Sequence, residues 1–138
     1  MTSTTETVAP ATDRCEENLD RYLRFWNTSP DDEGAGQAAD VFGEEVRYTA
    51  PVGVLAGRQA LIGFRRQFVQ HMGSVAFRAR REPEIHHGHA RLLWRLDVRG
   101  EQFATGTDVL AFDRDGRIGT VTTFLDEAPE GFDPHAHA

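Results

Sequence analysis

The chain has 138 residues, which suits one domain of ordinary size with a single hydrophobic core. Its 22 Asp and Glu residues outnumber 15 Lys and Arg, and the net charge of −7 argues against a nucleic-acid or anionic membrane partner. The lone cysteine, Cys15, cannot form an internal disulfide, and no apolar run is long enough to span a bilayer, so we expect a cytoplasmic protein.

Three segments are expected along the chain. Residues 1–12 are Thr-rich and acidic and predict a disordered tail, and residues 128–138 contain two prolines and predict a second flexible tail. No internal repeat or linker interrupts the stretch between them, so residues 13–127 are expected to fold as one domain.

The first folded element is expected to be an amphipathic helix. Its apolar positions recur at helical spacing, at Cys15, Leu19, Tyr22 and Trp26. Asp13 is predicted to be the N-cap, with Glu16 three residues later. The segment "NTSPDDEG" is expected to end this helix.

Two more helices and a strand follow. A short helix is predicted over Ala35–Phe42, and "EEVRYTAPVG" (44–53) is predicted to be a strand that Pro51 ends. A third helix after Gly57 ends at Gly73, a residue type common at helix C-termini. Its apolar face consists of Leu61, Phe64, Phe68 and Met72.

The second half of the chain alternates long strands with turns. The strands are expected at "SVAFRARREPEI" (74–85), "ARLLWRLDV" (90–98), "QFATGTDVLAF" (102–112) and "RIGTVTTFLDE" (117–127). Helices followed by a run of antiparallel strands are typical of an α+β fold. We expect a strongly curved, mostly antiparallel sheet wrapped around the three helices as a cone, enclosing an apolar pocket that opens at the mouth.

Asp108 is an acid in an apolar setting. It lies on the predicted strand before a turn at 113–116, and alternation places it on one face with Gly106, Leu110 and Phe112. A carboxyl group in an apolar wall tends to keep its proton and can then donate a hydrogen bond, here to a ligand. Alternatively, Asp108 caps a backbone kink or pairs with an arginine of a neighbouring strand, and the sequence leaves both interpretations open.

Tyr22 lies on the apolar face of the first helix, one turn before Trp26, so its hydroxyl is expected to point into the same interior. By itself, a buried tyrosine is satisfied by a backbone carbonyl. Together with Asp108, it would form a pair of donors that stabilises a developing oxyanion.

Two segments carry a resemblance to a known fold family. "VFGEEVRYTAPVGVLAGRQALIGF" (41–64) has an acidic pair before a strand, Pro-x-Gly after it and Gly-Arg opening the third helix. "ATGTDVLAFDRDGRIGTVTTFLDE" (104–127) has Gly-x-Asp before an Asp-Gly-Arg-Ile turn. With these features the chain resembles the nuclear transport factor 2-like superfamily, in its SnoaL-like and ketosteroid-isomerase-like branch, over nearly the whole domain. Because this superfamily contains enzymes, binding proteins and accessory domains, the resemblance implies a fold more strongly than an activity.

The resemblance implies catalytic roles for Tyr22 and Asp108, which match the oxyanion-hole tyrosine and the protonated aspartic acid of the isomerases. Ala50 stands where those enzymes carry their general-base aspartate, immediately before the proline of the first strand. Because alanine cannot move a proton, steroid isomerisation by that mechanism is not expected.

A second branch, the limonene-epoxide-hydrolase-like proteins, uses an Arg-x-Asp on one strand and an aspartate on the last strand. Arg95 and Asp97 match the first part, but Thr123 stands where the last acid belongs. By strand alternation, Arg95 and Asp97 also lie on the face opposite the apolar one. We therefore expect a surface ion pair of small energetic value instead of a catalytic triad.

The histidines flank a turn or end a helix. His86, His87 and His89 are expected to be solvated rather than to bind a metal, and neither a metal nor a cofactor is expected. His71 is the histidine best placed to supply the missing base, because the third helix covers the mouth of the cone.

We expect a pocket enzyme that performs acid–base chemistry on a hydrophobic carbonyl, polyketide-like or terpenoid-like compound. The reaction would be an isomerisation, a cyclisation as in the SnoaL-like polyketide cyclases, or a dehydration. Ala50 favours a rival interpretation, a non-catalytic binding protein for a hydrophobic small molecule. A third class, a protein-interaction module, predicts a filled core without a cavity.

The predicted substrate-binding residues are mostly aromatic or aliphatic, which suits a flat hydrophobic ligand with one or two oxygens. They are Trp26, Tyr48, Ala50, Phe64, Phe68, Leu92, Trp94, Leu110, Thr123 and Leu125. The opposite face of the sheet is small and neutral and is expected to support a homodimer. That face contains Thr107, Val109, Ala111 and Thr122.

Overall fold

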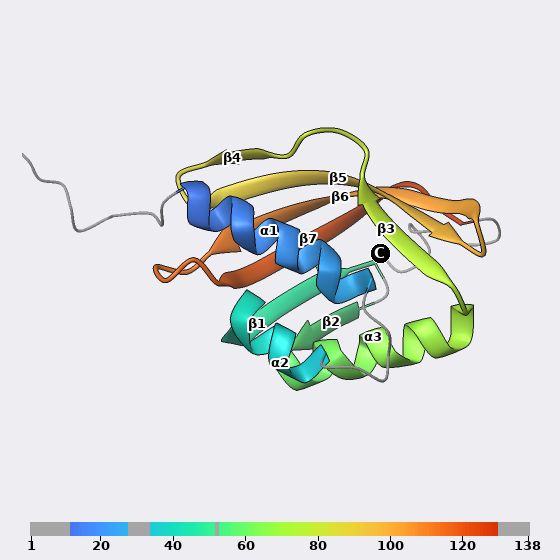
Figure 1. Ribbon diagram of the computed structural model, residues 1–138, viewed down its shortest axis with the longest axis horizontal. Coiled ribbons are helices and arrows are strands. Elements are labelled where there is room, and N and C mark those ends of the chain that lie inside the picture. The colour runs from blue at the N-terminus through green and yellow to red at the C-terminus, as the bar shows by residue number, and fades with distance from the viewer. Residues whose placement is uncertain (1–11, 28–33, 52, 130–138) are drawn as a thin grey trace, which may run out of the picture.

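The computed structural model describes residues 12–27, 34–51 and 53–129 (Figure 1). The helices are α1 (Thr12–Asn27), α2 (Gly34–Val41) and α3 (Arg58–Met72). The strands are β1 (Phe42–Ala50), β2 (Gly53–Ala56), β3 (Val75–Ala79), β4 (Glu84–His86), β5 (His89–Val98), β6 (Glu101–Phe112) and β7 (Ile118–Glu127). Residues 1–11 and 130–138, which belong to the two predicted tails, lie outside the described residues.

The described strands form one curved sheet in the order β2-β1-β7-β6-β5-β3, with β4 paired to β5. Every pairing is antiparallel except that of β1 with β7, which is parallel. Helix α1 contacts β3 and β4, and α3 contacts β1 and β2, so the helices cover the inner side of the curve (Figure 1). The predicted α+β fold, with a curved sheet around helices of the N-terminal half, is confirmed.

Helix α1 buries the predicted face, including Cys15, Leu19, Tyr22 and Trp26. The predicted N-cap is wrong, because the helix begins at Thr12 and places Asp13 in its first turn. An acidic side chain is also favourable there, since it faces the positive end of the helix dipole.

Three features differ from the sequence prediction. Strand β2 was not predicted, and it returns alongside β1 with Ala50 opposite Gly53. Helix α2 ends at Val41, so Phe42 opens β1 instead of closing the helix. The predicted strand over 74–85 is two strands, β3 and β4, separated by a segment that contains Pro83.

Alternation along β5 and β6 is confirmed. Leu92 and Trp94 are buried, as are Asp108 and Leu110, whereas Val109 is 41% exposed on the outer face. The turn between β6 and β7 is confirmed as well. The Gly116 N–H donates to the Asp113 carbonyl at 2.9 Å, and Gly116 has φ of 86°.

Asp97 lies on the outer face as predicted, but the expectation of a weak surface pair needs correction. Its side chain is only 6% exposed, because two arginines cover it. Arg78 donates to Oδ2 at 2.5 Å and Arg95 donates to Oδ1 at 2.7 Å. These hydrogen bonds, first from Arg78 and then from Arg95, hold the pKa of Asp97 below its usual value.

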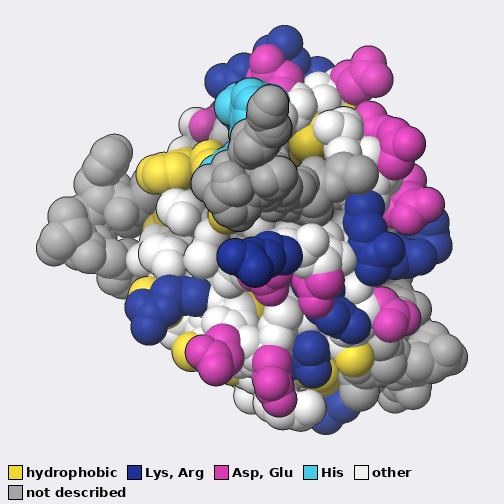
Figure 2. All heavy atoms as spheres, turned by 90° about the vertical axis from the view of Figure 1, so that its left-hand side faces the viewer, with side chains coloured by type: hydrophobic (Ala, Val, Ile, Leu, Met, Phe, Trp, Pro, Cys, Tyr) yellow, Lys and Arg dark blue, Asp and Glu magenta, His cyan; other side chains and the backbone are white. Residues whose placement is uncertain are grey.

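Acidic and basic side chains are interspersed on the end of the molecule that Figure 2 shows. In the described part of the chain, no helix is both long and apolar enough to cross a membrane.

Candidate functional site

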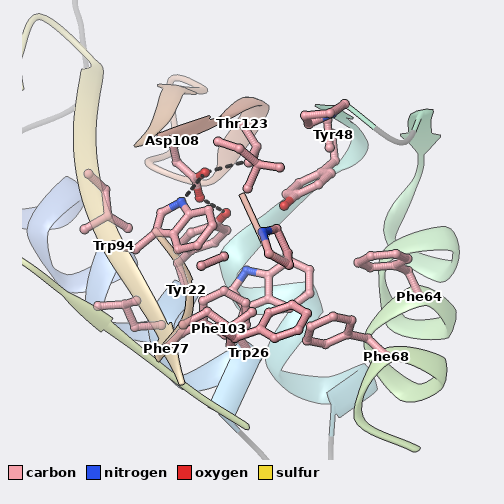
Figure 3. A pocket seen from close by; sticks show the side chains of 18 of the residues that line it. Tyr22, Trp26, Tyr48, Phe64, Phe68, Phe77, Trp94, Phe103, Asp108 and Thr123 are labelled. Atoms are coloured by element: carbon pink, nitrogen blue, oxygen red, sulfur yellow. Dashed lines mark hydrogen bonds between the residues drawn. The ribbon is translucent and has the colours of Figure 1, made fainter. Parts of the chain in front are cut away.

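A cavity of about 410 Å³ lies between the inner face of the sheet and helices α1 and α3 (Figure 3). Its wall is largely aromatic and contains nearly every residue predicted for it. These are Tyr22, Trp26, Tyr48, Ala50, Phe64, Phe68, Leu92, Trp94, Asp108, Thr123 and Leu125. The side chains come from both helices and from strands across the sheet, so only the folded chain brings them together.

Leu110 is the exception, because it does not line the cavity. It is fully buried and belongs to the hydrophobic core with Ile118 and Val121. Because Leu110 lies two residues beyond Asp108 towards the β6–β7 turn, it packs below the cavity and does not face it.

The wall also contains residues that the sequence analysis did not select. Leu96 and Phe77 could have been found from strand alternation, and Met72 from the apolar face of α3. Phe103 and Ala104 are adjacent in β6 and yet both line the cavity. The pairing of β5 with β6 shifts register at this point, and the extra residue of the bulge allows both side chains to face inward.

Asp108 lies at the polar end of the cavity and is 3% exposed. Its Oδ1 accepts hydrogen bonds from Trp94 Nε1 and Thr123 Oγ1, each at 2.8 Å. Its Oδ2 accepts a hydrogen bond from Tyr22 Oη at 2.5 Å (Figure 3). Thr123 faces Asp108 directly across β6 and β7, whereas Tyr22 reaches it from α1.

Burial is the largest effect on the Asp108 carboxyl and raises its pKa above the usual value. The hydrogen bonds from Tyr22, Thr123 and Trp94 lower the pKa but do not cancel that effect. Burial, followed by the charge of Asp108, also raises the pKa of Tyr22 well above its usual value. The tyrosine is therefore neutral and keeps its hydroxyl proton.

Tyr22 and Asp108 were predicted to act as two parallel donors to one ligand, and the structure places them in series. When Asp108 is ionised, the Tyr22 hydroxyl donates to Oδ2. When Asp108 is neutral, its O–H can donate to the Tyr22 oxygen, which leaves the tyrosine proton free to point elsewhere. Both residues line the cavity, so this second state offers a donor to a bound ligand.

Tyr48 contributes another hydroxyl from β1, and Figure 3 shows it pointing into the cavity near Thr123. Burial raises the pKa of Tyr48, and the charge of Asp108 raises it further. This tyrosine is also a neutral donor under ordinary conditions.

The remaining candidates lie elsewhere. His71, the histidine considered for the missing base, is exposed near the end of α3 and does not line the cavity. His86, His87 and His89 are exposed at the β4–β5 turn, as predicted. Ala50 lies in the wall and brings no group that can move a proton.

Comparisons with protein-family models and with curated proteins find no match. Solved structures do match. A SnoaL-like protein from Agrobacterium tumefaciens strain C58 is 27% identical, with a TM-score of 0.76 over 83% of this chain and 99% of that one. An NTF2-like protein from Exiguobacterium sp. 255-15 is 22% identical, with a TM-score of 0.65 over 79% and 98%. A SnoaL-like protein from Jannaschia sp. CCS1 is 12% identical, with a TM-score of 0.70 over 86% and 89%.

These likenesses extend over 79% to 86% of the chain. The chain has the fold of the nuclear transport factor 2-like superfamily, in agreement with the sequence analysis. Within the superfamily, SnoaL-like proteins are among its structural neighbours, and this branch is the one that the comparisons support.

Proposed function

We propose that this protein is a pocket enzyme that moves a proton on a neutral, hydrophobic carbonyl compound. The observation that carries the proposal is a buried carboxyl group with a raised pKa at the end of an aromatic cavity. A carboxyl group of raised pKa can act as an acid or a base near neutral pH.

The wall chemistry supports a neutral substrate. Among the described residues that line the cavity, Asp108 is the one acidic residue, and there is no lysine, arginine or histidine to pair with an anionic ligand. A substrate carboxylate would therefore be desolvated without compensation. A flat, apolar molecule with its oxygen at the Tyr22 and Tyr48 end would satisfy both hydroxyls and cover the aromatic wall.

The proton would move through Tyr22. In the neutral state of the pair, Asp108 donates to Tyr22, and the Tyr22 hydroxyl donates to the substrate oxygen and stabilises negative charge that develops there. In the ionised state, the pair can accept a proton from the carbon next to the carbonyl. Isomerisation, cyclisation and dehydration each need such a transfer and need no external oxidant.

The relatives add limited support. The name of the Agrobacterium protein suggests an isomerase, and that of the Jannaschia protein suggests a polyketide cyclase. Both reactions rearrange bonds within one substrate by moving protons. The rival function is non-catalytic binding of the same class of molecule, and the observation that favours it is Ala50, which leaves the wall without a second carboxyl group.

Hydrogen exchange at carbon tests the proposal before the natural substrate is identified. A panel of bicyclic ketones such as 1-tetralone is incubated in D₂O with the wild-type protein, and deuterium at the carbon next to the carbonyl is measured by mass spectrometry. Ligand binding is followed in parallel by tryptophan fluorescence. We expect protein-dependent exchange that Asp108→Asn abolishes while binding persists.

Asp97→Asn is the matched control, because the Asp97 side chain lies on the outer face of the sheet and does not line the cavity. It should retain the wild-type exchange rate. Equal exchange in Asp108→Asn and wild type would contradict the assignment of Asp108. Binding across the panel without exchange would show that the cavity only binds its ligand.

A further inference from the structure

Trp94 and Gly106 are opposite each other on β5 and β6. A Cβ atom at position 106 would overlap the Trp94 indole at Cζ2, lie 2.7 Å from its Cε2 and lie 2.5 Å from the Phe124 carbonyl oxygen. The indole therefore packs directly against the backbone of Gly106. Gly106 is not among the glycines with positive φ, so the position requires glycine for space and not for backbone conformation.

The close approach of the indole to Gly106 lets its N–H point along β6 towards Asp108. Asp108 is two residues beyond Gly106 and on the same face, because side chains of a strand alternate. With the ring packed against Gly106, Nε1 of Trp94 donates to Oδ1 of Asp108 at 2.8 Å. Any side chain at 106 would lift the ring and lengthen this hydrogen bond.

Arg80 fixes the same residue pair through the backbone. Its Nε donates to the Trp94 carbonyl at 2.9 Å, and its Nη2 donates to the Gly106 carbonyl at 3.0 Å. Nη2 also donates to Oδ2 of Asp126 at 2.6 Å, which orients the guanidinium group. The two strands are thus tied together at the point where the indole is seated.

We propose that Trp94 is a positioning residue for the Asp108 carboxyl group. Gly106 leaves room for the indole ring and Arg80 holds the two backbones together, and both contacts keep the indole N–H on Oδ1. An indole nitrogen can only donate, whereas the hydroxyls of Tyr22 and Thr123 can donate or accept. Oδ1 is therefore always an acceptor. The proton of neutral Asp108 is confined to Oδ2, which faces Tyr22 and the route to the cavity.

This inference deepens the proposed function, and its importance for catalysis rests on that function. Its test requires no substrate. The Asp108 carboxyl carbon is titrated by NMR in the full chain, in wild type and in Trp94→Phe, Gly106→Ala and the double variant. Gly63→Ala is the matched control, because a Cβ atom at Gly63 meets nothing within 4 Å.

We expect Trp94→Phe to shift the midpoint of the Asp108 titration upward, because the ionised carboxylate loses a donor. Gly106→Ala should shift it in the same direction, and Gly63→Ala should leave it unchanged. In the Trp94→Phe background, Gly106→Ala should add no further shift, since no indole N–H remains to be displaced. A shift of equal size in both backgrounds, or no shift in Trp94→Phe, would overturn the inference.

The wild-type protein gives a second readout if Gly106→Ala does not fold. The indole N–H signal of Trp94, assigned by its absence in Trp94→Phe, should titrate with the midpoint of Asp108 and should stop titrating in Asp108→Asn. A Trp94 signal that ignores the protonation of Asp108 would refute the proposed contact. If these titrations behave as expected and the ketone panel shows no exchange, the positioning role stands and the proposed enzyme activity fails.

Discussion

Replacing Asp108 with asparagine should remove a specific part of the pH dependence of folding stability. Asparagine has the shape of the neutral acid. Its Oδ1 can accept from Trp94 and Thr123, and its amide can donate to the Tyr22 oxygen, so the wild-type hydrogen bonds are matched. The variant should therefore fold and differ from wild type mainly in having no proton to lose.

The sign and size of the effect follow from burial. The pKa of Asp108 is raised in the folded state, whereas the unfolded chain has the ordinary value of about 3.9. The stability that the neutral acid contributes is complete below the unfolded pKa and is lost as pH rises through the folded pKa. Between these two values, wild type should lose about 1.4 kcal/mol per pH unit relative to Asp108→Asn.

Urea unfolding followed by tryptophan fluorescence, at intervals from pH 4 to 8, measures this difference in the free energy of unfolding. Asp97→Asn is the control, because the contribution of Asp97 to the free energy of unfolding should change with pH in the opposite direction. The pKa of Asp97 is lowered, so its stabilisation is present above the unfolded pKa and is lost only as pH falls. A difference between wild type and Asp108→Asn that stays constant from pH 4 to 8 would refute the raised pKa.

Three further predictions concern packing, the turn and association. Leu92→Ala, at a fully buried core position, should lower the free energy of unfolding by about 2–5 kcal/mol in the same assay. Gly116→Ala should cost about 1–3 kcal/mol, because φ is 86° and a Cβ atom would press on the Arg14 side chain; a smaller loss than Gly63→Ala would contradict this. We also propose that the outer sheet face forms a homodimer. Val109 is 41% exposed on this face, so Val109→Lys should sediment as a monomer whereas wild type sediments as a dimer. Wild type that sediments as a monomer would contradict the proposed dimer.

Local patterns in the sequence predicted most of the secondary structure. The helical spacing of Cys15, Leu19, Tyr22 and Trp26 predicted which face of α1 is buried, and alternation predicted that Asp108 faces inward. These properties depend only on neighbours along the chain. The errors at Asp13 and Phe42 are shifts of one or two residues at element boundaries, where competing local signals are nearly equal in energy.

The contacts of the site required information that no local pattern carries. Trp94 was predicted as part of an apolar wall, yet its indole N–H binds Asp108 because Gly106 leaves room for the ring. Thr123 was noted because it stands where the epoxide-hydrolase-like proteins carry an aspartate. Its hydroxyl donates to the same carboxyl group of Asp108. Both contacts depend on strand register, which is set by pairing between segments distant in sequence.

The sequence by itself therefore determined the α+β fold, the inward face of each long strand and the presence of an acid and a tyrosine in one apolar interior. Periodicity alone decides these features, because a helix or strand exposes its faces at a fixed spacing. Tertiary structure decided that Tyr22 is hydrogen-bonded to Asp108, that Asp97 is covered by Arg78 and Arg95, and that Leu110 does not line the cavity. Those outcomes depend on distances between elements, and such distances are fixed only when the sheet curves around the helices.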